Sequence, residues 1–197
     1  PGTDPAPAAQ GSGSGPLRLL CVASLTPRKG HDLLLRALAG LMDESWQLDC
    51  VGSRDRDQAW AEGLLRLRTE LGLAGRVRLL GSLPDEDLAR RYGVADLFVL
   101  PSRFEGYGMV LAEALARGLP ILACRAGAIG DLIPPEAGIL VPPEDPMALR
   151  QALRCLMTDP ALRRRLARGA RVAGLGLPTW KSAIAAFASA IEEALDG

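Results

Sequence analysis

The sequence predicts an α/β fold, a Rossmann-like, doubly wound parallel sheet of six strands. Short apolar runs alternate with longer segments of helical periodicity, which is typical of repeated βαβ units. The runs are apolar almost throughout, as expected of strands that helices cover on both faces. The predicted folded domain extends over residues 17–178.

Each predicted element has a local signal in the sequence. The six strands are the apolar runs 17–23, 46–51, 77–80, 97–100, 121–124 and 139–141. The helices lie near 30–41, 56–72, 85–93, 108–117, 128–133, 146–157 and 160–172. Asp145 and Asp159 each precede a proline, so each is expected to cap the helix that follows. Acidic residues after Pro84 mark the start of the third helix.

The N-terminal segment 1–16 differs in composition from the rest of the chain. It is rich in glycine, proline and alanine and has almost no large apolar side chain, so folding it would bury little surface. We predict a flexible linker or tail. Its glycine repeat 11–15 does not follow a strand and is not expected to bind a nucleotide.

Charge and composition restrict the partners. The chain has 23 basic and 23 acidic residues and a pI near 7.1, which disfavours nucleic-acid and membrane-surface binding. We expect a cytoplasmic protein, because the sequence has no apolar run long enough to span a membrane and its N-terminus lacks the charged-then-apolar order of a signal peptide. Four cysteines are scattered singly and predicted to be buried free thiols, and His31 is the one histidine. No metal or other cofactor is expected.

The loop after the first predicted strand contains a candidate anion site. Lys29 and Gly30 lie where a helix begins, and the free amides and dipole of a helix start favour an anionic group. An ammonium about 4 Å from a phosphate contributes about 4 kcal/mol at an effective dielectric near 20, before desolvation. A solvated basic turn is the alternative.

The loop after the fourth predicted strand carries two glutamates, Glu105 and Glu113, with a helix starting near Gly108 between them. Gly106 and Gly108 allow the backbone to approach a ligand closely. Glu113 lies about 7.5 Å along the helix from Gly108, at about 1.5 Å per residue. A carboxylate there can accept hydrogen bonds from vicinal hydroxyls. Because its neighbours are apolar, Glu113 is expected to have a polar partner.

This loop and helix resemble the retaining glycosyltransferases of the GT-B fold, family 4, also called group 1. Glu105 and Glu113 match the E-x7-E pattern of that family, and Lys29 with Gly30 matches its lysine-glycine pair. The resemblance runs from about residue 17 to the C-terminus and corresponds to the C-terminal half, which binds the nucleotide-sugar donor.

The resemblance implies a role for each matching position. Glu113 would bind ribose hydroxyls, and Glu105 would bind hydroxyls of the donor sugar. Lys29 would neutralise the diphosphate and stabilise the departing nucleotide, so Lys29 and Glu105 are the expected catalytic residues. The other expected donor contacts are Ser24, Arg28, Gly30, Leu83, Gly106, Tyr107, Gly108, Met109 and Val110. The resemblance implies neither a covalent nucleophile nor a metal ion, and the donor would be a UDP-, GDP- or ADP-sugar.

Several positions depart from the family pattern. Ala23 and Ser24 stand where a glycine-arginine pair is usual in the family. The arginine guanidinium that would bind the diphosphate is therefore replaced by the neutral hydroxyl of Ser24. Arg28 could substitute, although we favour a donor held by Lys29 and backbone amides alone. The loop 127–131, which resembles the family's loop near the sugar, has alanine and aspartate where glycine and glutamate are usual.

The acceptor-binding half of a GT-B enzyme would precede residue 17. We therefore expect a partial protein that is inactive alone, with any membrane contact made through the other half. In the family the last helix packs on that half. In the predicted segment 179–197, Ile184, Phe187, Ile191 and Leu195 fall on one helical face. The alternative is that this face covers its own domain.

The triplet Asp55-Arg56-Asp57 is a second candidate ligand group, because the other main glycosyltransferase fold uses such carboxylates to hold a divalent metal. Here it lies among charged residues at a helix start, so a capping cluster is favoured.

Other functions remain open. One is a nucleotide-sugar-binding module without transfer activity, and another is a sugar-nucleotide epimerase or hydrolase of related fold. A dinucleotide oxidoreductase is less favoured, because no G-x-G-x-x-G follows the first strand. The base, the sugar, the acceptor and the oligomeric state are not predicted.

Overall fold

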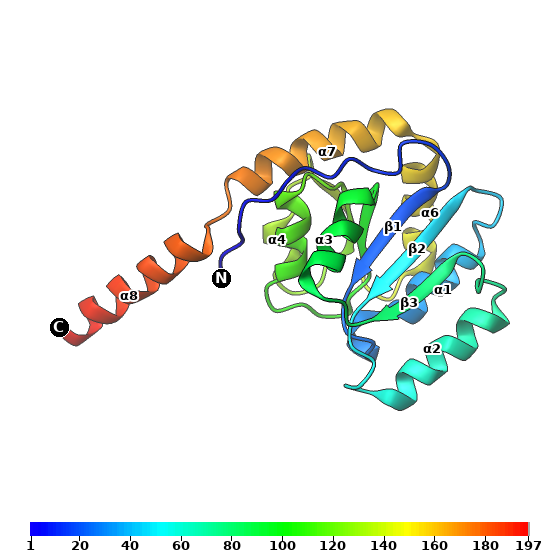
Figure 1. Cartoon of the computed structure of the whole chain (residues 1–197), viewed down its shortest axis with the longest axis horizontal. Helices are drawn as coiled ribbons and strands as arrows, with labels where there is room; N and C mark the ends of the chain where they lie inside the picture. The colour runs from blue at the N-terminus through cyan, green and yellow to red at the C-terminus, as the bar shows by residue number, and fades with distance from the viewer. Residues whose placement is uncertain (197) are drawn as a thin grey trace.

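One sheet of six parallel strands forms the centre of the protein (Figure 1). The computed structural model describes residues 1–196, without the side chains of Glu192, Leu195 and Asp196. The strands are β1 (Leu17–Val22), β2 (Trp46–Val51), β3 (Val77–Gly81), β4 (Leu97–Leu100), β5 (Ile121–Cys124) and β6 (Gly138–Val141). Their order is β3-β2-β1-β4-β5-β6, so the predicted doubly wound sheet is confirmed.

Helices cover both faces of this sheet. They are a 3-10 turn η1 (Pro27–Lys29), α1 (His31–Ala39), α2 (Gln58–Glu70), α3 (Asp85–Val94), α4 (Met109–Ala116), α5 (Ile129–Leu132), α6 (Pro146–Thr158), α7 (Pro160–Leu175) and α8 (Trp180–Asp196). Helix α1 packs against α2 and α6 on one face, while α3 and α4 lie on the other, where α7 packs against α4 (Figure 1).

The helix starts confirm the capping signals in the sequence. Asp145 accepts hydrogen bonds from the amides of Met147 and Ala148, and Asp159 accepts one from Leu162. Most predicted boundaries hold to within two or three residues. The 3-10 turn before α1 is an addition, which arises because Pro27 fixes its own φ and cannot donate a hydrogen bond.

The core lies between the sheet and its two helix layers. Every residue of β4 and β5 is buried, as predicted for strands covered on both faces. The largest fully buried side chains include Trp46, Tyr92 and Phe98, and the rings of Tyr92 and Phe98 stack with centroids 5.8 Å apart.

The cysteine prediction is correct for three residues and wrong for one. Cys21, Cys50 and Cys124 are buried free thiols on strands, whereas Cys155 is exposed. The residues that α6 buries are Leu149, Ala152, Leu153 and Leu156. Cys155 lies on the opposite side of this amphipathic helix and faces solvent.

The first sixteen residues form neither helix nor strand before β1 begins at Leu17, yet they follow the body of the domain (Figure 1). The amide of Thr3 donates to the carbonyl of Pro178 at 2.9 Å, and the amide of Ala9 donates to the carbonyl of Arg117 at 2.8 Å. The segment therefore lies along α4 and the end of α7.

Helix α8 extends away from the body (Figure 1). Its apolar face is exposed, with Ile184 64% and Phe187 69% accessible, so the helix does not cover its own domain. Leu195, which the sequence placed on the same face, lies outside the described side chains. Among the residues that the structure describes, no helix is long and apolar enough to span a membrane.

Candidate functional site

The candidate site lies where the order of the strands reverses. Strands β1 and β4 are neighbours at the centre of the sheet, and the connections leaving them run to opposite sides. Open parallel sheets bind ligands in the crevice at this switch point, beyond the carboxyl ends of the strands. Both predicted ligand loops start there, because residues 23–30 follow β1 and residues 101–108 follow β4.

The two loops are joined by hydrogen bonds to backbone carbonyls. The amide of Arg103 donates to the carbonyl of Arg28 at 2.8 Å, and the Arg28 guanidinium donates to the carbonyl of Phe104 at 3.0 Å. Gly30 has φ 69°, and a Cβ on it would lie 2.1 Å from the carbonyl oxygen of Pro101. Only glycine allows this approach, so the backbone requires a glycine directly after Lys29.

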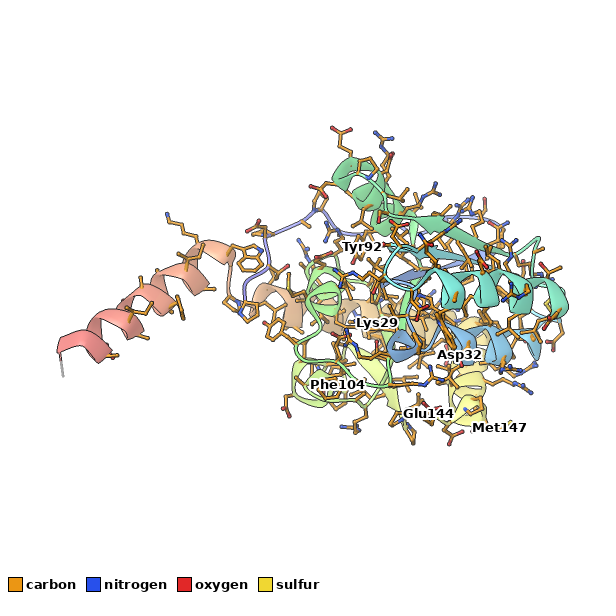
Figure 2. The ribbon with its side chains drawn as sticks, turned by 90° about the horizontal axis from the view of Figure 1, so that it is seen from below. Lys29, Asp32, Tyr92, Phe104, Glu144 and Met147 are labelled. Carbon is orange, nitrogen blue, oxygen red and sulfur yellow. The ribbon has the colours of Figure 1, made fainter. Side chains whose placement is uncertain are left out.

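Lys29 and Glu105, the two expected catalytic residues, form an ion pair. The Lys29 Nζ lies 2.5 Å from Glu105 Oε2, and each side chain is only 12% exposed. The Ser102 hydroxyl, fully buried, donates to the same carboxylate oxygen at 3.4 Å. In Figure 2, Lys29 lies centrally, with Tyr92 and Phe104 on either side of it. An anionic ligand at Lys29 would compete with the Glu105 carboxylate.

Glu113 has the polar partner that its apolar neighbours led us to expect. The Tyr92 hydroxyl, on α3, donates to Glu113 Oε2 at 3.0 Å. Burial, and then the charge of Glu113, raise the pKa of Tyr92 well above its ordinary value, so the phenol stays protonated and remains a donor. The Arg117 guanidinium lies 4.4 Å from the centre of the Tyr92 ring. The carboxylate is thus oriented while one of its oxygens stays free of Tyr92.

Helix α4 supplies backbone donors beside these side chains. Gly108, at φ 88°, is its N-cap, and the helix begins at Met109 as predicted. The amides of the first turn have no partner inside a helix, so those of Met109 and Val110 can meet an anion. Gly106 is exposed, and the Tyr107 hydroxyl donates to the carbonyl of Pro1 at 3.5 Å.

A third loop, after β5, supports the loop that carries Glu105. The amide of Ala128 donates to the Glu105 carbonyl at 3.1 Å, and a Cβ on Gly127 would lie 2.0 Å from the same oxygen. Two other predicted contacts, Ser24 and Leu83, are half-buried at the ends of β1 and β3. The Arg28 side chain is exposed, and its guanidinium is bound to the loop after β4.

A cavity of about 320 Å³ opens beside Glu113. Its lining includes Glu113 and Tyr92, with Leu88 and Met109 as apolar walls and Thr3 from the N-terminal segment. The lining does not include Lys29 or Glu105. The carboxylate of Glu113 is therefore accessible from a hollow between α3 and α4, separate from the ion pair.

The Asp55-Arg56-Asp57 triplet has the capping role that the sequence favoured. Asp57 is the N-cap of α2, with its carboxylate accepting from the amide of Trp60 at 3.0 Å. Asp55 interacts with Ser53, two residues before it.

Arg103 is a residue of the site that sequence reasoning missed. Its guanidinium donates to both carboxylate oxygens of Asp32 at 2.9 Å and also bonds Glu144 and the carbonyl of Pro27. Burial opposes ionisation of Asp32, but the hydrogen bonds and charge of Arg103 outweigh it and hold the pKa of Asp32 below its ordinary value. Arg103 thus connects the loops after β1, β4 and β6. Its partners are distant in the sequence, so no local pattern reveals the cluster.

The doubly wound sheet defines an α/β domain of the kind found in GT-B glycosyltransferases. The chain belongs to the glycosyl transferases group 1 family, whose pattern it matches over residues 3–173. This confirms the family and fold that the motifs predicted.

Similar proteins include curated relatives and solved structures. The chain is 37% identical over 160 residues to D-inositol 3-phosphate glycosyltransferase of Thermomonospora curvata, an alignment that covers 77% of this chain and 37% of the relative. It is also 33% identical over 181 residues to a GDP-mannose-dependent alpha-(1-6)-phosphatidylinositol monomannoside mannosyltransferase of Mycolicibacterium smegmatis. That alignment covers 87% of this chain and 46% of the relative. The chain therefore spans less than half the length of these relatives.

Two solved structures superpose on most of the chain. Sucrose-phosphate synthase of Thermosynechococcus elongatus gives a TM-score of 0.82 at 33% identity, covering 92% of this chain and 46% of that one. Anabaena HepE, in complex with UDP-glucose, gives a TM-score of 0.79 at 25% identity, covering 92% of this chain and 49% of that one.

Proposed function

We propose that this chain is the donor-binding part of a retaining glycosyltransferase. The enzyme would move a sugar from a nucleoside-diphosphate sugar to an acceptor hydroxyl. The main supporting observation is that Lys29 and Glu105, from loops after different strands, meet at the switch point of the sheet. The similarity to HepE, solved with UDP-glucose, and to a GDP-mannose-dependent enzyme supports a nucleotide-sugar donor.

The donor would lie across the carboxyl ends of β1 and β4. Glu113 would accept hydrogen bonds from ribose hydroxyls, because it is half-buried and oriented by Tyr92 and borders the cavity. The diphosphate would lie between Lys29 and the first-turn amides of α4. These donors meet the negative charge without a metal ion.

Transfer would depend on the exchange of partners at Lys29. When the diphosphate binds, the Lys29 ammonium leaves Glu105 and contacts phosphate oxygens, and the Glu105 carboxylate becomes free to accept from the sugar. As the bond to the sugar breaks, negative charge grows on the departing diphosphate, and Lys29 and the amides of α4 stabilise it. The acceptor hydroxyl would attack from the same face and pass its proton to that phosphate, which retains the configuration of the sugar.

The remainder of the enzyme would supply the acceptor site. The relatives are more than twice as long as the matched region, which leaves room for a second domain. We propose that the chain binds the donor and does not transfer the sugar without that domain.

A module that binds a nucleotide sugar without transfer is the second candidate. Ser24 favours it, because a neutral residue stands where the family pattern has an arginine, and Lys29 is neutralised by Glu105. A full-length protein that binds the donor but transfers no sugar to any acceptor would identify such a module.

Calorimetric titration of the chain with UDP, GDP and ADP tests the proposed function. We expect weak, saturable binding of at least one of these nucleotides, and reduced affinity at higher salt because the Lys29 contact is ionic. The absence of binding heat with all three nucleotides would contradict the assignment of the site.

A further inference from the structure

Two cysteines and the single histidine meet in the core of the domain. Cys21 on β1 and Cys50 on β2 are directly opposite each other in the register of the sheet, so their side chains lie on the same face. His31, the first residue of α1, packs on that face. The Cys21 Sγ lies 3.7 Å from His31 Nε2, and the ligand atoms of all three residues lie within 4.8 Å of one another.

We propose that Cys21, Cys50 and His31 form a binding site for a thiophilic divalent cation, for which Zn²⁺ is the representative ion. Two sulfur atoms and one imidazole nitrogen form a soft ligand set of the kind that binds zinc in proteins, and they would fill three of its four usual positions, with a water molecule in the fourth. Ligand atoms that surround a common zinc at about 2.0–2.3 Å lie roughly 3.5–4 Å apart. The Cys21–His31 separation is already within this range, and the distances from the other two ligand atoms to Cys50 Sγ are at most 4.8 Å.

Burial and charge support a divalent ion. The three residues are at most 1% exposed, and a net charge in such a place would be costly. Two thiolates and a neutral imidazole carry two negative charges, which one divalent cation cancels.

The ring of His31 has one nitrogen beside the two cysteines and one directed elsewhere. Its Nδ1 is buried and has no hydrogen-bond partner among the described residues. With the contact between Nε2 and Cys21 alone, the hydrogen-bonding capacity of this buried ring is only partly satisfied. A metal bound at Nε2 would replace the weak contact to the thiol with a stronger bond, and Nδ1 would then carry the proton of the neutral imidazole.

The position of the site suggests a structural role. The cation would join β1, β2 and the start of α1. His31 directly follows Gly30, so the ion would also fix the turn that carries Lys29. The site does not depend on the proposed glycosyl transfer and would be filled during folding, because no ligand atom is open to solvent.

Metal content of the chain tests the proposal. We would express the chain in medium with added Zn²⁺, dialyse it against metal-free buffer, and measure zinc by elemental analysis. We expect about one zinc per chain, at least a tenfold loss in Cys50→Ala and His31→Gln, and no loss in Cys124→Ala or Cys155→Ala. Cys124→Ala is the matched control, because Cys124 is also a buried strand cysteine but lies on β5.

A second measurement does not depend on the variants folding. In a chain expressed with Co²⁺ in place of zinc, thiolate-to-cobalt charge-transfer absorption is expected in the unmodified protein. A chain that holds no zinc and no cobalt would overturn the proposal. Zinc that is lost in Cys155→Ala and kept in Cys50→Ala would equally overturn it, since the ion would then be bound at the surface.

Discussion

Arg103→Ala is expected to destabilise the domain through the loss of its bonds to Asp32. The two bonds are both 2.9 Å long, and the side chains are 26% and 18% exposed. A hydrogen bond between charged groups contributes about 1.5–3 kcal/mol, and partial exposure reduces this, so we estimate a loss of about 2 kcal/mol for the pair. At about 2–4 °C per kcal/mol for a domain of this size, the Tm would fall by about 4–8 °C.

The effect has a defined dependence on pH. The pKa of Asp32 is lower in the folded state than in the unfolded chain, where it is about 3.9. The contribution of the ion pair to stability is therefore fully present above the unfolded-state pKa and is lost as the pH falls through the folded-state pKa. The difference in unfolding free energy between Arg103→Ala and the unmodified chain should therefore be the same at pH 7 and pH 5.5. It should shrink in strongly acidic solution, as measured by urea unfolding.

Arg90→Ala is the matched control for this prediction. Arg90 also pairs with two carboxylates, those of Glu86 and Asp87, but its side chain is 70% exposed on the surface of α3. Exposed pairs of this kind contribute little, so we expect a change below about 0.5 kcal/mol. If Arg103→Ala were no more destabilising than Arg90→Ala, the reasoning that the cluster holds the loops together would be refuted.

Three further outcomes follow from the structure. Gly30→Ala places a Cβ against the Pro101 carbonyl at a positive φ, so thermal unfolding should show a loss of about 2 kcal/mol or more; an unchanged Tm would contradict this turn geometry. Thiol titration of the native chain should modify Cys155 alone, and a second rapidly reacting thiol would contradict the burial of the others. Brief trypsin treatment should cut after Lys181, because α8 projects from the body, and resistance there would mean that the helix docks.

The fold could be predicted from the sequence because its signals are local. Continuous apolar runs such as 97–100 mark strands that are covered on both faces, and residues such as Asp145 and Asp159 cap the helices that begin immediately after them. Both signals lie within a few positions of the structure that they produce. The errors are also local in origin, since the turn at Pro27–Lys29 is too short to show any periodicity.

The candidate site was predictable in part. Lys29 and Glu105 each follow a strand, and strands of a parallel sheet end at the same edge, so their proximity could be expected once the strands were assigned. The partners of these residues could not be inferred in this way. Tyr92 reaches Glu113 from another helix, and Arg103 reaches Asp32 from another loop, and such contacts depend on packing across the domain.

The core cluster shows the same limit. Cys21 and Cys50 are single cysteines in the sequence, and neither has a metal-ligand motif around it. Only the register of β1 against β2 brings them together, and only the packing of α1 adds His31. The sequence therefore favours isolated thiols where the structure has a cluster.

The contribution of Glu113 to ribose recognition provides the most direct test of the proposed donor site. Calorimetry would compare the affinity of the best-bound nucleoside diphosphate with that of its 2′-deoxy form, in the unmodified chain and in Glu113→Ala. We predict that the unmodified chain prefers the ribonucleotide by about 1–3 kcal/mol, roughly 5- to 150-fold, and that Glu113→Ala binds both forms equally. An unchanged preference in Glu113→Ala would contradict the account, because the ribose would then be bound elsewhere.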